Sequence, residues 1–169
     1  MHQTHSGSAT PAAPAEDKAM RHNHYRRLLI MAVLSLIAMY ILMYAMVNTV
    51  DNIYPNFNQF YMAGLMVAPM VIIELALMRA MYPDKRLNAL IITVSVIGLF
   101  AFFMLIRQQT AISDKQFLRS MIPHHAAAIL MCERASLQDP EIRTLCENIL
   151  SSQQAEIDQM TAKLRELER

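Results

Sequence analysis

Charged residues and glycines are both scarce in this sequence. Asp, Glu, Lys and Arg make up 17% of the 169 residues and hydrophobic types 54%, which is more apolar than an average soluble domain. Only three glycines are present, and there is no phosphate-cradling glycine loop, no GxSxG nucleophile elbow and no CxxCH haem attachment motif. We therefore expect a protein that catalyses no reaction.

Long apolar runs are what the sequence does contain. A run of roughly 18 or more apolar residues can cross a membrane as a helix. The first run is too long for a signal peptide and has no small-residue cleavage site after it. We predict three transmembrane helices within 28–106, at Leu28–Val47, Phe60–Met78 and Ala89–Ile106.

The basic residues around these spans predict their orientation. They precede the first span and occupy the second loop, whereas the first loop has none: Lys18, Arg21, Arg26, Arg27, Arg79, Lys85 and Arg86. By the positive-inside tendency, the N-terminus is cytoplasmic and everything after Ile106 lies on the far side. We expect a multi-pass protein of a bacterial inner membrane with a periplasmic C-terminal region.

Residues 1–27 are rich in Ser, Thr, Ala, Pro and His without apolar periodicity, which predicts a disordered cytoplasmic tail. Its histidines are His2, His5, His22 and His24. Solvated histidines are the favoured interpretation over a weak metal trap, because nothing preorganises them.

Residues 107–169 predict an antiparallel helical hairpin. Ser113 and Gln116 have the spacing of a capping box, so a helix is expected from about Asp114 to about Leu137. A proline within it, Pro123, predicts a kink. Asp139 followed by Pro140 predicts the start of the second helix.

The hairpin is small and has no strong charge of either sign. Its eight basic and nine acidic residues give no reason to expect nucleic acid as a partner. So short a hairpin cannot bury much core alone. We expect it to pack on a second copy, as a homodimer that completes a four-helix bundle, or on the membrane region.

Two motifs in the hairpin resemble the CopM-like family, a bacterial helical family called domain of unknown function 305. The motifs are "MIPHHAAAILM", from Met121 to Met131, and "QAEIDQM", which belongs to a Gln-x-x-Glu-Ile-x-x-Met pattern from Gln153 to Met160. The resemblance implies half of a ferritin-like four-helix bundle, in a family that often repeats this unit, and copper binding in the periplasm. Two departures are the single unit and Cys132, where a small residue is expected.

The spacing of these residues also favours a metal site on physical grounds. His124 lies over Met131 on a helix, and Met121 and His125 share a neighbouring strip. Thioether sulfur with imidazole suits Cu(I) better than hard cations. Met160 is a further ligand candidate, and Gln153 and Glu156 could hold an imidazole N–H in the shell behind the ligands.

Other interpretations of the same residues stay open. His124 and His125 could be core residues hydrogen-bonded to Glu156, or zinc ligands together with it. Cys132 and Cys146 are equally far from the turn, so a disulfide, two buried thiols or thiolate ligands are all compatible with their positions. In the second span, Glu74 is an intramembrane functional candidate, or it pairs with Arg79 or Lys85.

We therefore predict a membrane-anchored periplasmic protein that binds copper, as Cu(I), for tolerance or for hand-off to a donor or acceptor protein. The alternative is a membrane-anchored interaction or assembly module with structural histidines. A transporter is disfavoured by the small number of spans.

Overall fold

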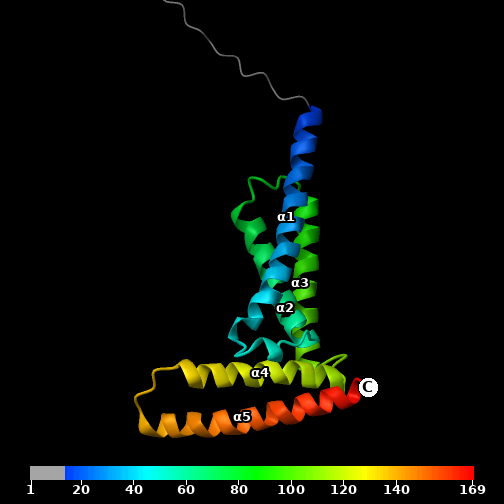
Figure 1. Ribbon diagram of the computed structural model, residues 1–169. Helices are drawn as coiled ribbons and strands as arrows, with labels where there is room; N and C mark the ends of the chain where they lie inside the picture. Colours follow the sequence, from blue (N-terminus) through cyan, green and yellow to red (C-terminus); the bar gives the residue numbers. More distant parts are fainter. Residues whose placement is uncertain (1–13) are drawn as a thin grey trace, which may run out of the picture.

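The computed structural model describes residues 14–169, and all regular secondary structure in this part of the chain is helical (Figure 1). Two short 3-10 helices, η1 and η2, lie between the first two α-helices. In chain order the elements are α1 (Pro14–Leu42), η1 (Met43–Met46), η2 (Val50–Asn52), α2 (Phe57–Leu77), α3 (Lys85–Gln108), α4 (Asp114–Arg134) and α5 (Pro140–Leu167). The predicted all-α fold is confirmed.

Three of these helices are long and apolar enough to cross a membrane. The candidate spans in the described part of the chain are Asn23–Met46, Phe57–Leu77 and Lys85–Gln108, with mean hydropathies of 2.5, 2.0 and 2.8. They differ from the sequence-predicted runs by a few residues at each end, because the apolar runs are shorter than the helices that contain them. Three candidate membrane helices are therefore confirmed.

Helix α1 begins well before the first apolar run. The expectation of a disordered tail is wrong for residues 14–27, because the helix starts at Pro14. Proline is favoured at the first helical position, and Glu16 and Asp17 suit the positive end of a helix dipole. Residues 1–13, with His2 and His5, lie outside the described residues.

The apolar helices pack through small residues and one buried, mainly aliphatic cluster. Leu28 of α1, Val71 and Leu75 of α2, and Tyr82 form a buried cluster at one end. Nearer the start of α2, Gly64 lies directly against the ring of Phe102 from α3, where a Cβ atom would overlap the ring. The missing side chain therefore permits the close approach of these two helices.

Helices α4 and α5 form the predicted antiparallel hairpin, which lies crosswise at the end of the apolar helices that is opposite the start of α1 (Figure 1). A buried cluster joins the two helices: Ile122, Ala126, Ile129, Ile157 and Leu164. Helix α4 is continuous through Pro123 and ends at Arg134. This end is earlier than the expected Leu137, because Ala135 already has extended backbone angles.

Of the two N-cap predictions for the hairpin, the structure confirms one and contradicts the other. Asp139 caps α5 as predicted, since its carboxylate accepts hydrogen bonds from the amides of Glu141 and Ile142. The prediction of a capping box at the start of α4 is wrong. Ser113 makes no side-chain cap, and Gln116 accepts instead from the amide of Phe57, 3.1 Å away at the start of α2. A tertiary contact has displaced the local one.

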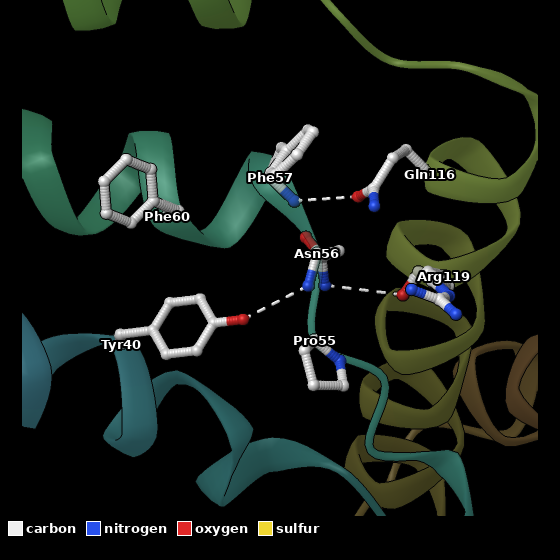
Figure 2. A pocket seen from close by; sticks show the side chains of 7 residues that line it. All are labelled: Tyr40, Pro55, Asn56, Phe57, Phe60, Gln116 and Arg119. Carbon is white, nitrogen blue, oxygen red and sulfur yellow. Dashed lines mark hydrogen bonds between the residues drawn. The ribbon is translucent and has the colours of Figure 1, made fainter.

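Contacts around Asn56, at the start of α2, attach the hairpin to the membrane region (Figure 2). Asn56 is 3% exposed and caps α2 by accepting from the amide of Gln59. Its side-chain amide also donates to the carbonyl oxygens of Tyr54, at 2.9 Å, and Arg119, at 3.4 Å. The hydroxyl of Tyr40 accepts from the backbone amide of Asn56. One buried side chain thus links the loop, α2 and α4.

Candidate functional site

The two adjacent histidines of α4 lie in different environments. His125 is buried, whereas His124 is exposed, and their ring centroids are 6.0 Å apart. Nδ1 of His125 lies 3.0 Å from the carbonyl oxygen of Met121, and Nε2 lies 2.6 Å from a carboxylate oxygen of Glu156 on α5. Both ring nitrogens of His125 are therefore engaged within the hairpin, as the interpretation with structural histidines expects.

His124 belongs to a strip of α4 that α5 leaves uncovered. The strip, here called the open face, has alternating spacings of four and three residues: Phe117, Met121, His124, Ala128 and Met131. Phe117 is 49% exposed and Met131 57% exposed, while Met121 is half-buried. Such a spacing keeps all five residues on one side of a helix.

The flank of the hairpin across from the open face is covered by the loop between α1 and α2. Val47 and Tyr54 from this loop pack on the hairpin core. A polar cavity of about 430 Å³ separates the loop from α5, with Asn48, Asp51 and Arg165 among its lining residues. The hairpin was expected to pack on a second copy or on the membrane region. Within one chain, the membrane region covers one flank of the hairpin and leaves the open face free.

The remaining candidates on α5 do not lie on the open face. Met160 packs against the buried core cluster, so its sulfur is not on the open face. Glu156 is half exposed and occupied by His125. Gln153 has a buried side-chain oxygen without a hydrogen-bond partner among the described residues. The structure therefore brings Met121, His124 and Met131 to one face, and places His125 and Met160 behind it.

Ligand chemistry on this face depends on methionine. In the described part of the chain, no group of three His, Cys, Asp or Glu side chains is arranged to hold a metal ion. A nitrogen and oxygen site of the kind that zinc prefers would need His124, His125 and Glu156 together, which this geometry does not provide. Thioether sulfur beside the imidazole of His124 remains, and this donor set suits a soft ion.

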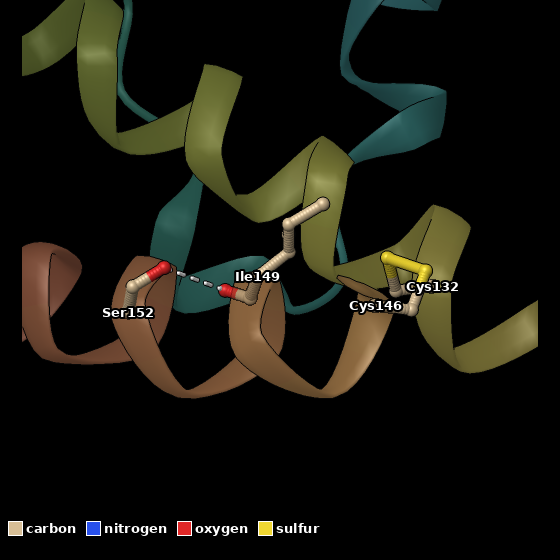
Figure 3. The surroundings of a disulfide bond; sticks show 4 residues. All are labelled: Cys132, Cys146, Ile149 and Ser152. Atoms are coloured by element: carbon tan, nitrogen blue, oxygen red, sulfur yellow. Dashed lines mark hydrogen bonds between the residues drawn. A yellow bond between two sulfur atoms is a disulfide. The ribbon is translucent and has the colours of Figure 1, made fainter. Parts of the chain in front are cut away.

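The two cysteines are joined (Figure 3). Cys132 and Cys146 form a disulfide between α4 and α5, with Cα atoms 5.3 Å apart, and Ile149 points toward α4 one turn further along. In this form neither sulfur is a buried thiol or a thiolate ligand. The bridge clamps the hairpin near its turn and takes no part in the open face.

Glu74 has different neighbours from those expected. It lines a cavity together with His24 and Arg27 of α1, and with Tyr82. The reason is that α1 extends past the first apolar run and packs beside this end of α2. Sequence reasoning missed this neighbourhood, as it missed Asn56, because only the capping preference of Asn56 for α2 is visible locally.

Comparison with known proteins places the chain in a family. The family model described as "Domain of unknown function (DUF305)" matches residues 102–166, which comprise the hairpin and the end of α3. The chain is also 37% identical over 142 residues to "Uncharacterized protein L153" of Acanthamoeba polyphaga mimivirus, an alignment that covers 82% of this chain and 91% of that protein. No solved structure matches.

The alignment with the viral protein is more than twice as long as the DUF305 match, so the likeness extends beyond the hairpin into the apolar helices. The chain therefore belongs to the same family as this viral protein, and its hairpin carries the DUF305 domain.

Proposed function

We propose that the protein is a membrane-anchored metal-binding protein that takes up a soft ion, Cu(I), on the open face of its hairpin. One observation carries this proposal: His124, Met121 and Met131 share a face that neither α5 nor the loop covers. Imidazole and thioether donors together favour Cu(I) over Mg²⁺ or Ca²⁺. The protein holds the ion for tolerance or hands it to another protein.

The spacing along α4 sets the ligand roles. Met121 and His124 are three residues apart, a rise of about 4.5 Å, so both can reach one ion. Met131 lies about 10 Å along the axis from His124 and completes the ligand set best from a second copy of the hairpin. His125 joins only if the Glu156 carboxylate moves away from its Nε2 atom, and Met160 only after the hairpin core repacks.

The proposed location follows from the charges at the two ends of the membrane region. Arg26 and Arg27, with Lys85 and Arg86, belong to the end that carries the start of α1 and the α2–α3 connection. The hairpin is at the opposite end (Figure 1). By the positive-inside tendency the hairpin is outside the cytoplasm, which in a bacterial inner membrane means the periplasm.

A competitive Cu(I) titration of the full-length protein in detergent tests the proposal. The double variant Met121→Leu/His124→Ala removes two donor atoms, whereas Phe117→Ala changes the same face without removing a donor. We expect the double variant to bind one Cu(I) ion fewer than the wild type and Phe117→Ala to bind as the wild type does. Equal binding by all three proteins contradicts the proposal.

A second candidate is an interaction module in which the open face pairs with another hairpin and binds no metal. The alternating spacings of four and three residues, typical of helix–helix seams, and the engagement of both His125 nitrogens favour it. Sedimentation of the detergent-solubilised protein separates the two. Self-association that survives a strong copper chelator, and that Phe117→Ala weakens, favours the module; dissociation by the chelator favours metal binding.

A further inference from the structure

A second cluster of metal-binding side chains lies at the other end of the membrane region. A cavity of about 220 Å³ separates the first turns of the span in α1 from the end of α2 and the α2–α3 connection. Leu28 and Tyr82 form its apolar wall. The donor-bearing side chains that line it come from distant parts of the sequence: His24, Met31, Glu74 and Met81.

His24 is held with an unsatisfied nitrogen. Its Nδ1 atom is buried and has no hydrogen-bond partner within the part of the chain that the structure describes. The ring of Tyr82 stands edge-on to it, with centroids 6.5 Å apart and planes at 76°. This packing orients the imidazole but leaves Nδ1 without a partner. Because a buried polar atom without a partner costs free energy, an ion that reaches Nδ1 would relieve that cost.

The other donors define the class of ligand. Met31 and Met81 contribute two thioether sulfurs, and Glu74 contributes one carboxylate. Burial, and to a smaller extent the Glu74 carboxylate and Tyr25, raises the pKa of Tyr82 above its ordinary value. The phenol is therefore neutral at physiological pH and does not compete as an anionic ligand. One imidazole and two thioethers are donors for a soft ion.

Charge favours a monovalent ion over a divalent one. Arg27 lines the same cavity, so its positive charge already balances Glu74. A monovalent ion leaves one excess charge in this partly apolar cavity and a divalent ion leaves two, which costs more in a medium of low dielectric constant. Zinc is thus disfavoured by charge as well as by the thioether donors.

We propose that this cavity is a second Cu(I) site, with His24, Met31 and Met81 as ligands and with Glu74 cancelling the charge of Arg27 beside them. It is separated from the open face by the length of the membrane region (Figure 1), and it shares no residue with that face. The two sites can therefore be present or absent independently.

The test uses the full-length protein in detergent with Cu(I), and with Ag(I) as a redox-inert analogue. His24→Ala/Met81→Leu removes two ligands of the cavity, and Met66→Leu, on an exposed methionine of α2, is the matched control. We expect the double variant to bind one ion fewer than the wild type and the control to be unchanged. X-ray absorption of the ion retained by Met121→Leu/His124→Ala should show sulfur and nitrogen neighbours.

Glu74→Gln keeps the shape of the side chain and removes only its charge, so it separates binding from folding. We expect this variant to keep the helical circular dichroism of the wild type and to bind the ion at the cavity at least tenfold more weakly. Unchanged stoichiometry in His24→Ala/Met81→Leu, with an unchanged affinity in Glu74→Gln, overturns the second site. That result leaves the open-face site to be judged by its own variants.

Discussion

Nε2 of His125 lies 2.6 Å from a carboxylate oxygen of Glu156, and this contact joins α4 to α5 across the hairpin. The other ring nitrogen faces the carbonyl oxygen of Met121. Both partners accept hydrogen bonds when Glu156 is ionised, so satisfying both requires a hydrogen on each nitrogen, which is the imidazolium form. His125 is thus a cross-link of the hairpin in this state.

Removing the carboxylate should destabilise the hairpin. Glu156→Ala leaves Nε2 of His125 without an acceptor, and we expect the free energy of unfolding to fall by about 1–3 kcal/mol, while Glu156→Gln keeps an acceptor and loses less. Glu166→Ala, which removes an exposed pair with Lys163, is the control and should cost at most about 0.5 kcal/mol. Denaturant titration followed by circular dichroism measures all three. Equal losses for the two alanine variants would contradict the cross-link.

Asn56 should control how firmly the hairpin is attached. Asn56→Ala removes a helix cap and the hydrogen bonds to Tyr54 and Arg119, so we expect a loss of about 2 kcal/mol and faster proteolysis at residues 109–113. Asn58→Ala removes three side-chain bonds, two exposed ones with Gln109 and one part-buried bond to Ser120, and should change the cleavage rate less. Limited proteolysis compares them. The same cleavage rate for both variants would show that the attachment does not depend on Asn56.

The disulfide should be present and stabilising in the mature protein. The closed loop between Cys132 and Cys146 spans about 15 residues, for which loop entropy predicts roughly 3 kcal/mol. Cys132→Ala/Cys146→Ala should lower the free energy of unfolding by about that amount. Thiol labelling before and after reduction counts the free cysteines. Two reactive thiols without a reductant would refute the pairing.

Gly64 should be intolerant of a methyl group, whereas Gly98 should not. A Cβ at Gly64 would overlap the ring of Phe102, and one at Gly98 meets nothing within 4 Å. We expect Gly64→Ala to lower the thermal midpoint by several degrees through overpacking, and Gly98→Ala to leave it unchanged. Differential scanning fluorimetry in detergent gives both midpoints. A tolerated Gly64→Ala would mean that α2 and α3 pack less closely than described.

Orientation can be measured in a background of Cys132→Ala/Cys146→Ala. Ala80→Cys lies in the α2–α3 connection and Ser136→Cys at the hairpin turn, and both positions are exposed. In intact cells, a membrane-impermeant maleimide should label Ser136→Cys and leave Ala80→Cys unlabelled until the membrane is opened. The reverse pattern would place the hairpin in the cytoplasm and remove the periplasmic setting from the proposed function.

The sequence allowed the elements of this fold to be predicted much better than their contacts. Hydropathy located three candidate spans because a run of about twenty apolar residues matches the length of helix that crosses a membrane. Asp139 with Pro140 located the start of α5 because capping is local. Gln116 was assigned the wrong partner, since it accepts from the amide of Phe57, 59 residues away. The proximity of Glu74 to His24 and Arg27 was missed because these residues are distant in the sequence. The contact between His125 and Glu156 was among the interpretations that the sequence left open. That His125 is buried while His124 is exposed was not predicted, because it depends on how α5 packs on α4.

The crosswise hairpin is held at one end only, like a cantilever, and its other end is free to bend. Its root is fixed under the apolar helices by Asn56 and Gln116, and an ion pair of 2.6 Å joins Arg119 to Glu168 near the same end. Its tip, the turn at 135–139, projects beyond the apolar helices (Figure 1). The covalent bridge sits close to that tip, where bending displaces the helices most. Reduction of the disulfide should therefore make the turn at 135–139 more mobile, while the end held by Asn56 and Gln116 stays rigid.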